Sequence, residues 1–181
     1  MSIPYIISAC LSPFLGGFVD RFGMRAIIAT VAPAILILVH ILMAETTVSP
    51  IGPMIGQGIA YSAFAAVIWP SVPLVVQMKL IGLGYGVITS IQNAGLAFFP
   101  LMVAAIYQSS DDEYIPNVEY FFVSLACLGV VVGIWLNLYD MSHGSVFNRP
   151  KNKELSASGY EPLIVMDEDE PPRSRINSRG F

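Results

Sequence analysis

The chain has 181 residues, of which 55% are hydrophobic and 12% are charged, and its formal net charge is −4. Soluble domains carry about 25% charged residues, and here the charges gather at a few places with long uncharged stretches between them. This pattern excludes an ordinary soluble domain. It gives no support to a nucleic-acid partner, because it contains no broad basic surface.

Five stretches are apolar enough and long enough to cross a membrane, which takes about 20 helical residues for roughly 30 Å of hydrocarbon. None of them shows the charged face of a soluble amphipathic helix. They run from about Ile3 to Val19, Ala26 to Ala44, Ile51 to Gln77, Gly84 to Tyr107 and Glu119 to Tyr139. The sequence therefore predicts an all-α, polytopic membrane helix bundle with five transmembrane helices in residues 1–140.

The composition changes abruptly after Asp140. Residues 141–181 are polar, rich in proline, serine and charge, and show no apolar period, which predicts a disordered tail. All nine basic residues fall in this tail or in the first and third connections between spans, whereas the other two connections are acidic. Because lysine and arginine favour the cytoplasmic side, we expect the tail to be cytoplasmic.

The connection after the first span carries a recognisable motif. It reads Gly16-Gly17-Phe18-Val19-Asp20-Arg21-Phe22-Gly23-Met24-Arg25. The spacing of Gly16, Asp20, Arg21, Gly23 and Arg25 resembles the signature loop of the major facilitator superfamily of transporters, with mild departures at three other positions. The alternative is an ordinary cytoplasmic turn between two spans.

The chemistry of this signature loop (residues 16–25) suits a conformational latch. Its first glycines would let two helices approach closely, and Asp20 could accept hydrogen bonds at a neighbouring helix N-terminus. Gly23 suits a tight turn, and Arg21 and Arg25 could pair with carboxylates or lipid phosphates. Such contacts would hold the cytoplasmic side closed and break when it opens.

The resemblance also suggests which part of a transporter this is. In the superfamily the loop lies between the second and third helices and, by repeat, between the eighth and ninth. Only three further spans follow here, so the five spans are expected to be helices 8–12 of a C-terminal half. The other helices would then be absent, and we expect this chain to be inactive alone.

Three stretches resemble a lysosomal branch of the superfamily more closely than the rest of it. They are residues 5–9 with 12–13, residues 61–62 with 69–70, and residues 84–86 with 90–97. This resemblance implies export of dipeptides from the lysosome by uniport, with a heavily glycosylated accessory protein as partner. The alternatives are a carrier for another small metabolite, such as a sugar or an organic anion, or a truncated isoform that does not transport.

Polar side chains inside the spans are the candidates for substrate binding. Thr89, Gln92 and Asn93 share a helix face by their i, i+3, i+4 spacing, and amides can both donate and accept hydrogen bonds. Ser62 and Trp69 lie two turns apart, and an indole can hold a cation over its ring. The alternative is that the two amides join neighbouring helices and that Trp69 only packs.

No feature of the sequence indicates an enzyme, a cofactor or a metal. The two cysteines lie outside metal and redox spacings, and there is no nucleophile–base pair or phosphate loop.

One further motif lies in the tail, where residues 159–163 match a tyrosine-based sorting pattern through Tyr160 and Leu163. In a cytoplasmic tail it would direct the protein to the lysosome, although so short a pattern also arises by chance.

Overall fold

The computed structural model describes residues 3–47, 49–110 and 113–150. Its elements are α1 (Ile3–Phe22), α2 (Arg25–Glu45), α3 (Ile51–Val75), the 3-10 helix η1 (Met78–Leu80), α4 (Ile81–Ser109) and α5 (Asn117–Ser142). All five α-helices are long and apolar enough to cross a membrane. The predicted all-α membrane helix bundle is confirmed.

Four helices form the packed part of the bundle, and the extensive contacts are those of α2 with α5, α1 with α3, and α2 with α3. Small residues allow these close approaches. A Cβ atom added at Gly133 of α5 would lie 2.6 Å from Thr30 Oγ1 on α2, and one added at Gly58 of α3 would lie 3.0 Å from the Pro4 backbone on α1. The backbones therefore meet where a side chain is missing.

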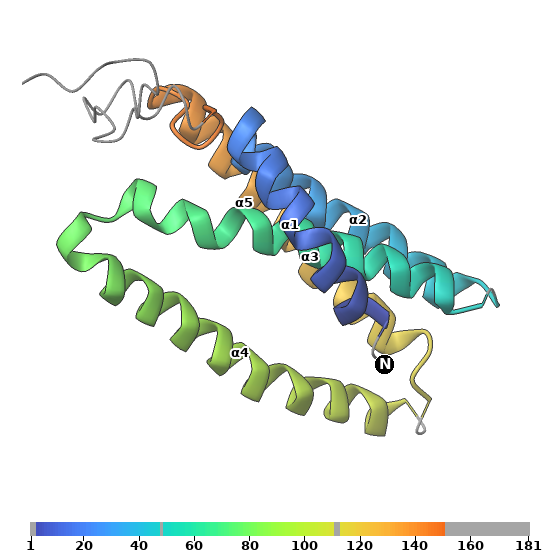
Figure 1. The fold of residues 1–181 in the computed structure, drawn as a ribbon. Coiled ribbons are helices and arrows are strands. Elements are labelled where there is room, and N and C mark those ends of the chain that lie inside the picture. The colour runs from blue at the N-terminus through green and yellow to red at the C-terminus, as the bar shows by residue number, and fades with distance from the viewer. Residues whose placement is uncertain (1–2, 48, 111–112, 151–181) are drawn as a thin grey trace, which may run out of the picture.

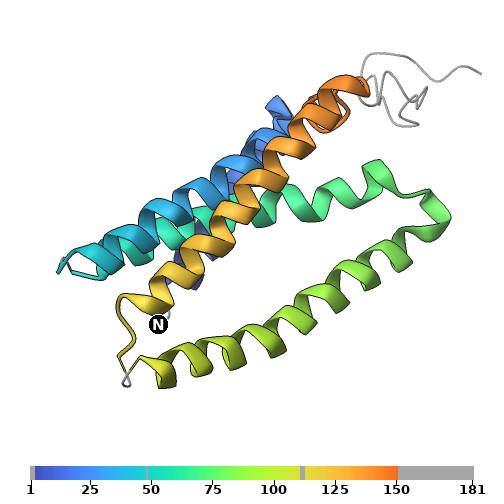
Figure 2. The same ribbon diagram turned by 180° about the vertical axis from the view of Figure 1, so that it is seen from behind.

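Helix α4 stands apart from these four in both ribbon views (Figures 1 and 2) and makes few contacts with α3 and α5. Its 29 residues give a length of roughly 43 Å, which exceeds the hydrocarbon thickness of about 30 Å. The helix is linked to the rest through η1 at its start and through residues 110–116 at its end. Most of its side chains are consequently left uncovered by this chain.

The first connection is shorter than expected. Asp20 and Arg21 belong to the last turn of α1, and α2 begins at Arg25, so only Gly23 and Met24 join the two helices. Both have a left-handed backbone, with φ values of 73° and 60°. Glycine adopts this conformation without steric cost, whereas methionine does not.

The tail begins as ordered structure, which corrects the expectation of disorder from residue 141. Helix α5 continues to Ser142, and residues 143–150, here called the C-terminal hook, turn back toward the connection between α1 and α2 (Figure 1). Gly144 and Ser145 make this reversal with φ values of 92° and 56°. Residues 151–181 lie outside the described residues.

The basic residues of the described chain gather at one end of the bundle. Arg21 and Arg25 flank the α1–α2 connection, Lys79 lies in η1, and Arg149 lies in the hook. The α1–α2 connection, η1 and the hook all lie at the same end in Figures 1 and 2. The connections at the opposite end carry Glu45 and Glu113.

Candidate functional site

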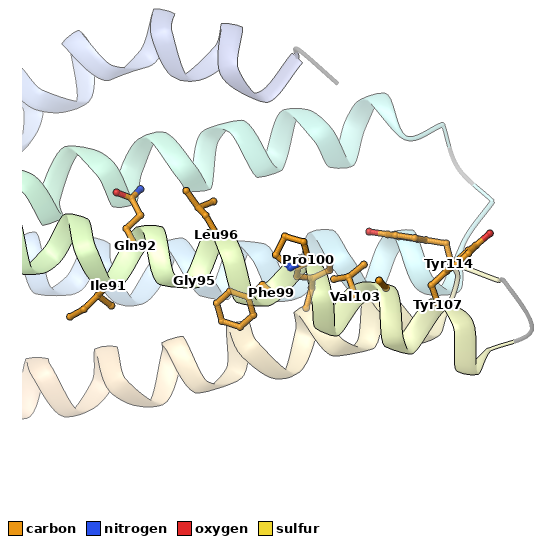
Figure 3. A pocket seen from close by; sticks show the side chains of 11 residues that line it. Ile91, Gln92, Gly95, Leu96, Phe99, Pro100, Val103, Tyr107 and Tyr114 are labelled. Atoms are coloured by element: carbon orange, nitrogen blue, oxygen red, sulfur yellow. The ribbon is translucent and has the colours of Figure 1, made fainter.

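A largely apolar pocket of about 870 Å³ lies along α4 and reaches the start of α5. Figure 3 shows side chains projecting from α4 on two sides, with Gln92 and Leu96 on one side and Ile91 and Phe99 on the other. Tyr107 and Tyr114 line the end nearest the connection to α5. The amide of Gln92 is therefore a polar group in a mainly hydrocarbon wall, as is common in small-molecule sites.

The three polar residues predicted on α4 are exposed and uncovered by this chain. Thr89, Gln92 and Asn93 are all solvent-accessible, but only Gln92 lines the pocket. Their shared face is thus available to a substrate or to another helix.

Ser62 takes a different position from the one predicted. Its side chain is fully buried, and its hydroxyl donates to the carbonyl oxygen of Gly58 one turn earlier, at 2.6 Å. Because Gly58 is the point where α3 meets α1, Ser62 lies in the packed part of the bundle. It does not line the pocket.

Trp69 has a partner that the sequence did not suggest. Its indole stacks on the ring of Tyr85, with centroids 6.1 Å apart and planes inclined by 23°. The Tyr85 hydroxyl also donates to the Trp69 carbonyl oxygen at 3.2 Å. This pair joins α3 to α4 near η1. Trp69 is therefore half-buried in a contact between helices and does not line the pocket.

The residues of the predicted latch are only partly arranged as expected. A Cβ atom added at Gly16 or Gly17 would meet nothing within 4 Å, so the described residues make no close helix approach there. The Arg25 guanidinium lies 3.8 Å from the Asp20 carboxylate, and Arg25 is buried while Asp20 is half exposed. The Arg21 guanidinium lies over the Phe22 ring at 5.7 Å from its centroid.

The N-terminus of α2 receives acceptors that the sequence did not reveal. The amides of Arg25, Ala26 and Ile27 donate to Phe147 and Asn148 of the hook. A helix N-terminus was the kind of partner expected for Asp20, and here the hook supplies acceptors to it. The residues concerned are separated by about 120 positions, and no local pattern indicates this contact.

A buried ionisable pair joins α2 to α5 at the opposite end. His40 Nδ1 lies 2.6 Å from Glu119 Oε2, and both residues are buried. The imidazole also stacks on Phe122, 5.1 Å between centroids. In the sequence, Glu119 begins the predicted fifth span, and His40 lies near the end of the second span on the same side of the bundle. This common level could have suggested the pair.

Tyr114 connects this pair with the pocket. It lies just before α5 and lines the pocket. Burial raises the pKa of the Tyr114 phenol, and the nearby Glu119 carboxylate raises it further. The phenol therefore remains a neutral hydrogen-bond donor at physiological pH. The predicted sorting residues Tyr160 and Leu163 lie outside the described residues.

Comparison with known proteins identifies the relatives of this chain. The profile of the Major Facilitator Superfamily matches residues 1–174. The protein named lysosomal dipeptide transporter MFSD1 from Danio rerio is 34% identical over 139 residues, which are 77% of this chain and 30% of that protein. The Homo sapiens protein of this name is 33% identical over 147 residues, 81% of this chain and 31% of that protein.

The protein of the same name from Gallus gallus is 36% identical over 139 residues, 75% of this chain and 31% of that protein. The chain thus spans slightly less than a third of the length of these relatives. With five membrane-spanning helices and a family match over nearly its whole length, the chain belongs to the major facilitator superfamily.

Proposed function

We propose that this chain forms helices 8–12 of a secondary transporter that exports dipeptides from the lysosome by uniport. The relatives named as lysosomal dipeptide transporters support the substrate class and the compartment. The observation in the fold that carries the proposal is the uncovered face of α4, where the amide of Gln92 borders an apolar pocket. Such an amide can accept from a peptide N–H and donate to a peptide carbonyl.

The charged ends of a dipeptide need partners that this face does not offer. Its candidate residues Thr89, Gln92 and Asn93 are all neutral. Substrates of such transporters are held between two halves near the bilayer midplane, so the second half supplies the charges. On its own, this chain is inactive.

The test uses the full-length transporter reconstituted in liposomes, with labelled dipeptides, sugars and organic anions as substrates. Replacing Gln92 with leucine should raise the apparent KM for dipeptides about five- to tenfold, as expected for one lost hydrogen bond. Gln108→Leu is the matched control, because Gln108 lies exposed on the same helix but does not line the pocket. Equal effects of the two variants would refute the role of Gln92, and uptake of sugars but not dipeptides would refute the substrate class.

Uniport makes a separate prediction. Dipeptide flux should follow the dipeptide gradient alone and should not change when an ionophore collapses a proton gradient. Flux that requires the proton gradient would contradict uniport and would indicate proton-coupled transport.

The orientation and delivery of the protein belong to the same proposal. The end that carries the hook faces the cytoplasm, because the basic residues gather there. Tyr160 and Leu163 then form a cytoplasmic sorting motif, and Tyr160→Ala should move tagged full-length protein to the plasma membrane. Unchanged lysosomal location of this variant would rule the motif out.

The proposed accessory partner is a heavily glycosylated protein of the lysosomal membrane. It should co-purify with the full-length transporter from lysosomal membranes. After treatment with glycosidase it should migrate faster in gel electrophoresis. Purification of the transporter without any glycosylated protein in stoichiometric amount would remove this partner from the proposal.

A further inference from the structure

The first turn of α2 lacks acceptors from its own helix. As in any α-helix, the first amides have no carbonyl one turn earlier to receive them, and the first helical bond here runs from the Ile28 N–H to the Met24 carbonyl at 2.9 Å. Serine, threonine, aspartate or asparagine normally provides an acceptor at the cap position. That position holds Met24, which makes no side-chain cap.

The C-terminal hook provides the missing acceptors. The Arg25 N–H donates to the Phe147 carbonyl at 3.2 Å. The Asn148 side-chain oxygen Oδ1 accepts from the Ala26 N–H at 3.2 Å and from the Ile27 N–H at 3.4 Å. An asparagine from the far end of the chain thus performs the task of a local N-cap.

Asp140 holds the capping asparagine in place. The Asn148 amide nitrogen Nδ2 donates to Asp140 Oδ2 at 3.1 Å, and the Phe147 N–H donates to Asp140 Oδ1 at 2.9 Å. Asp140 itself is buried, with 2% of its surface exposed. Because Asn148 Nδ2 donates to this carboxylate, the other end of the amide, Oδ1, is directed at the α2 amides.

The hook also covers the turn of the signature loop. A Cβ atom added at Gly23 would lie 2.5 Å from the backbone of Arg149 and 2.7 Å from the carbonyl oxygen of Asn148. Such distances require one of the two backbones to move. The glycine is therefore needed here for the approach of the hook as well as for its left-handed backbone.

From these contacts we infer that Asn148 and Asp140 are positioning residues for the signature loop. They fix the start of α2, and hence the separation and direction of α1 and α2 at the end where the latch must close and open. The last step, from loop position to transport rate, rests on the proposed transport function. The step from the hook to the loop does not.

Amide hydrogen exchange of the purified chain in lipid nanodiscs tests the first step directly. Asn148→Ala should speed exchange about tenfold in the segment that contains Arg25, Ala26 and Ile27. The loss of one hydrogen bond lowers the protection of an amide by a factor of about this size. Exchange farther along α2 should not change. Ser142→Ala is the matched control, because Ser142 is exposed nearby and its hydroxyl bonds within α5 and to His143. Unchanged exchange in Asn148→Ala would overturn the inference.

A swap of the two side chains separates positioning from general loss of stability. Asn148→Asp alone keeps the acceptor but places two carboxylates face to face. Asp140→Asn alone leaves one acceptor oxygen for two donors, so its amide N–H must face either Asn148 Nδ2 or the Phe147 N–H. Both single variants should exchange faster. The double variant Asp140→Asn with Asn148→Asp restores one donor and one acceptor at the pair and should bring exchange back toward the original rate, short only of the weak bond from Asn148 Nδ2 to Asn137 Oδ1 at 3.5 Å. A double variant no better than either single one would overturn the assigned pairing.

In the full-length transporter the same variants should change the maximal rate of dipeptide flux and leave KM within about twofold, because they act on the latch and not on the α4 face. Recovery of that rate in the double variant would support positioning. If exchange responds as stated but flux of the unaltered transporter is absent, the hook-to-loop inference stands and the proposed function fails. Altered exchange with an unaltered maximal rate would overturn the link to gating.

Discussion

His40 Nδ1 lies 2.6 Å from Glu119 Oε2, and this contact joins α2 to α5 at the end of the bundle opposite the hook. Both side chains are shielded, with 10% and 2% of their surfaces exposed. A buried charge without a partner is far more costly than one that is paired. The pair therefore stabilises the contact between α2 and α5 only while both side chains are present.

The first prediction concerns removal of one member of this pair. Glu119→Ala should lower the free energy of unfolding by about 1–3 kcal/mol, because it leaves a buried imidazole N–H without its acceptor. Thermal or denaturant unfolding in detergent micelles measures the change. Glu113→Ala removes an exposed carboxylate six positions earlier and should change stability by less than about 0.5 kcal/mol. Equal losses in the two variants would contradict a special role for the pair.

The second prediction concerns ionisation of Tyr114. Its pKa is raised first by burial and then by the Glu119 carboxylate, so the deprotonated phenolate is disfavoured in the folded state. The folded state consequently loses stability as the pH rises above the ordinary tyrosine value of about 10.

Replacing Glu119 with glutamine removes one of the two causes, and the pKa of Tyr114 should fall while staying above its ordinary value. The change can be read from the difference in ultraviolet absorbance between Glu119→Gln chains with and without Tyr114→Phe, titrated at alkaline pH. A pKa that rises or stays constant would be inconsistent with the charge of Glu119 acting on Tyr114.

The third prediction concerns the crossing of α2 and α5. Gly133→Ala should destabilise the bundle by about 1–3 kcal/mol, because the new Cβ would lie 2.6 Å from Thr30 Oγ1 and 2.9 Å from the Thr30 Cα. Gly17→Ala is the control within another span, where the added atom meets nothing within 4 Å and helix propensity favours alanine by up to about 1 kcal/mol. Unfolding in micelles should shift in opposite directions for the two variants.

The fourth prediction compares the two left-handed residues of the first turn. Met24→Asn should stabilise the fold by up to about 1 kcal/mol, since asparagine tolerates a left-handed backbone better than methionine. Gly23→Asn should destabilise it, although φ is similar, because its Cβ would collide with the hook backbone. A gain in stability from both substitutions would show that the hook does not press on Gly23.

The helices could be predicted from the sequence because each span is a local pattern of uncharged residues. The five expected stretches coincide with α1 to α5 apart from a few residues at their ends. The signature loop was equally local, since its residues are adjacent in the chain. Its turn proved shorter than expected because α1 keeps its helical bonds through Phe22, and the Gly23 N–H bonds to Val19 at 2.7 Å.

The partners of individual side chains could not be predicted in the same way. In a span that is apolar on all sides, sequence periodicity does not tell a helix-facing position from an exposed one. Ser62 was accordingly expected to face a substrate, yet it is buried and its hydroxyl donates to the carbonyl oxygen of Gly58, the residue where α3 approaches α1. The hook contacts connect Phe147 and Asn148 with residues 24–27, and no local signal reports such a distant pairing.

Helices in a hydrocarbon solvent gain little from apolar contact with one another, so polar contacts weigh heavily in fixing their register. The α2–α5 pair has such contacts at both ends. His40 meets Glu119 at one end, and Asn137 at the other donates to Ala26 O and Thr30 Oγ1, each at 2.8 Å. A slip of one turn, about 5.4 Å along the axis, would break both sets at once. The two sets of contacts therefore hold α2 and α5 in one register, and any motion that keeps them must carry both helices together.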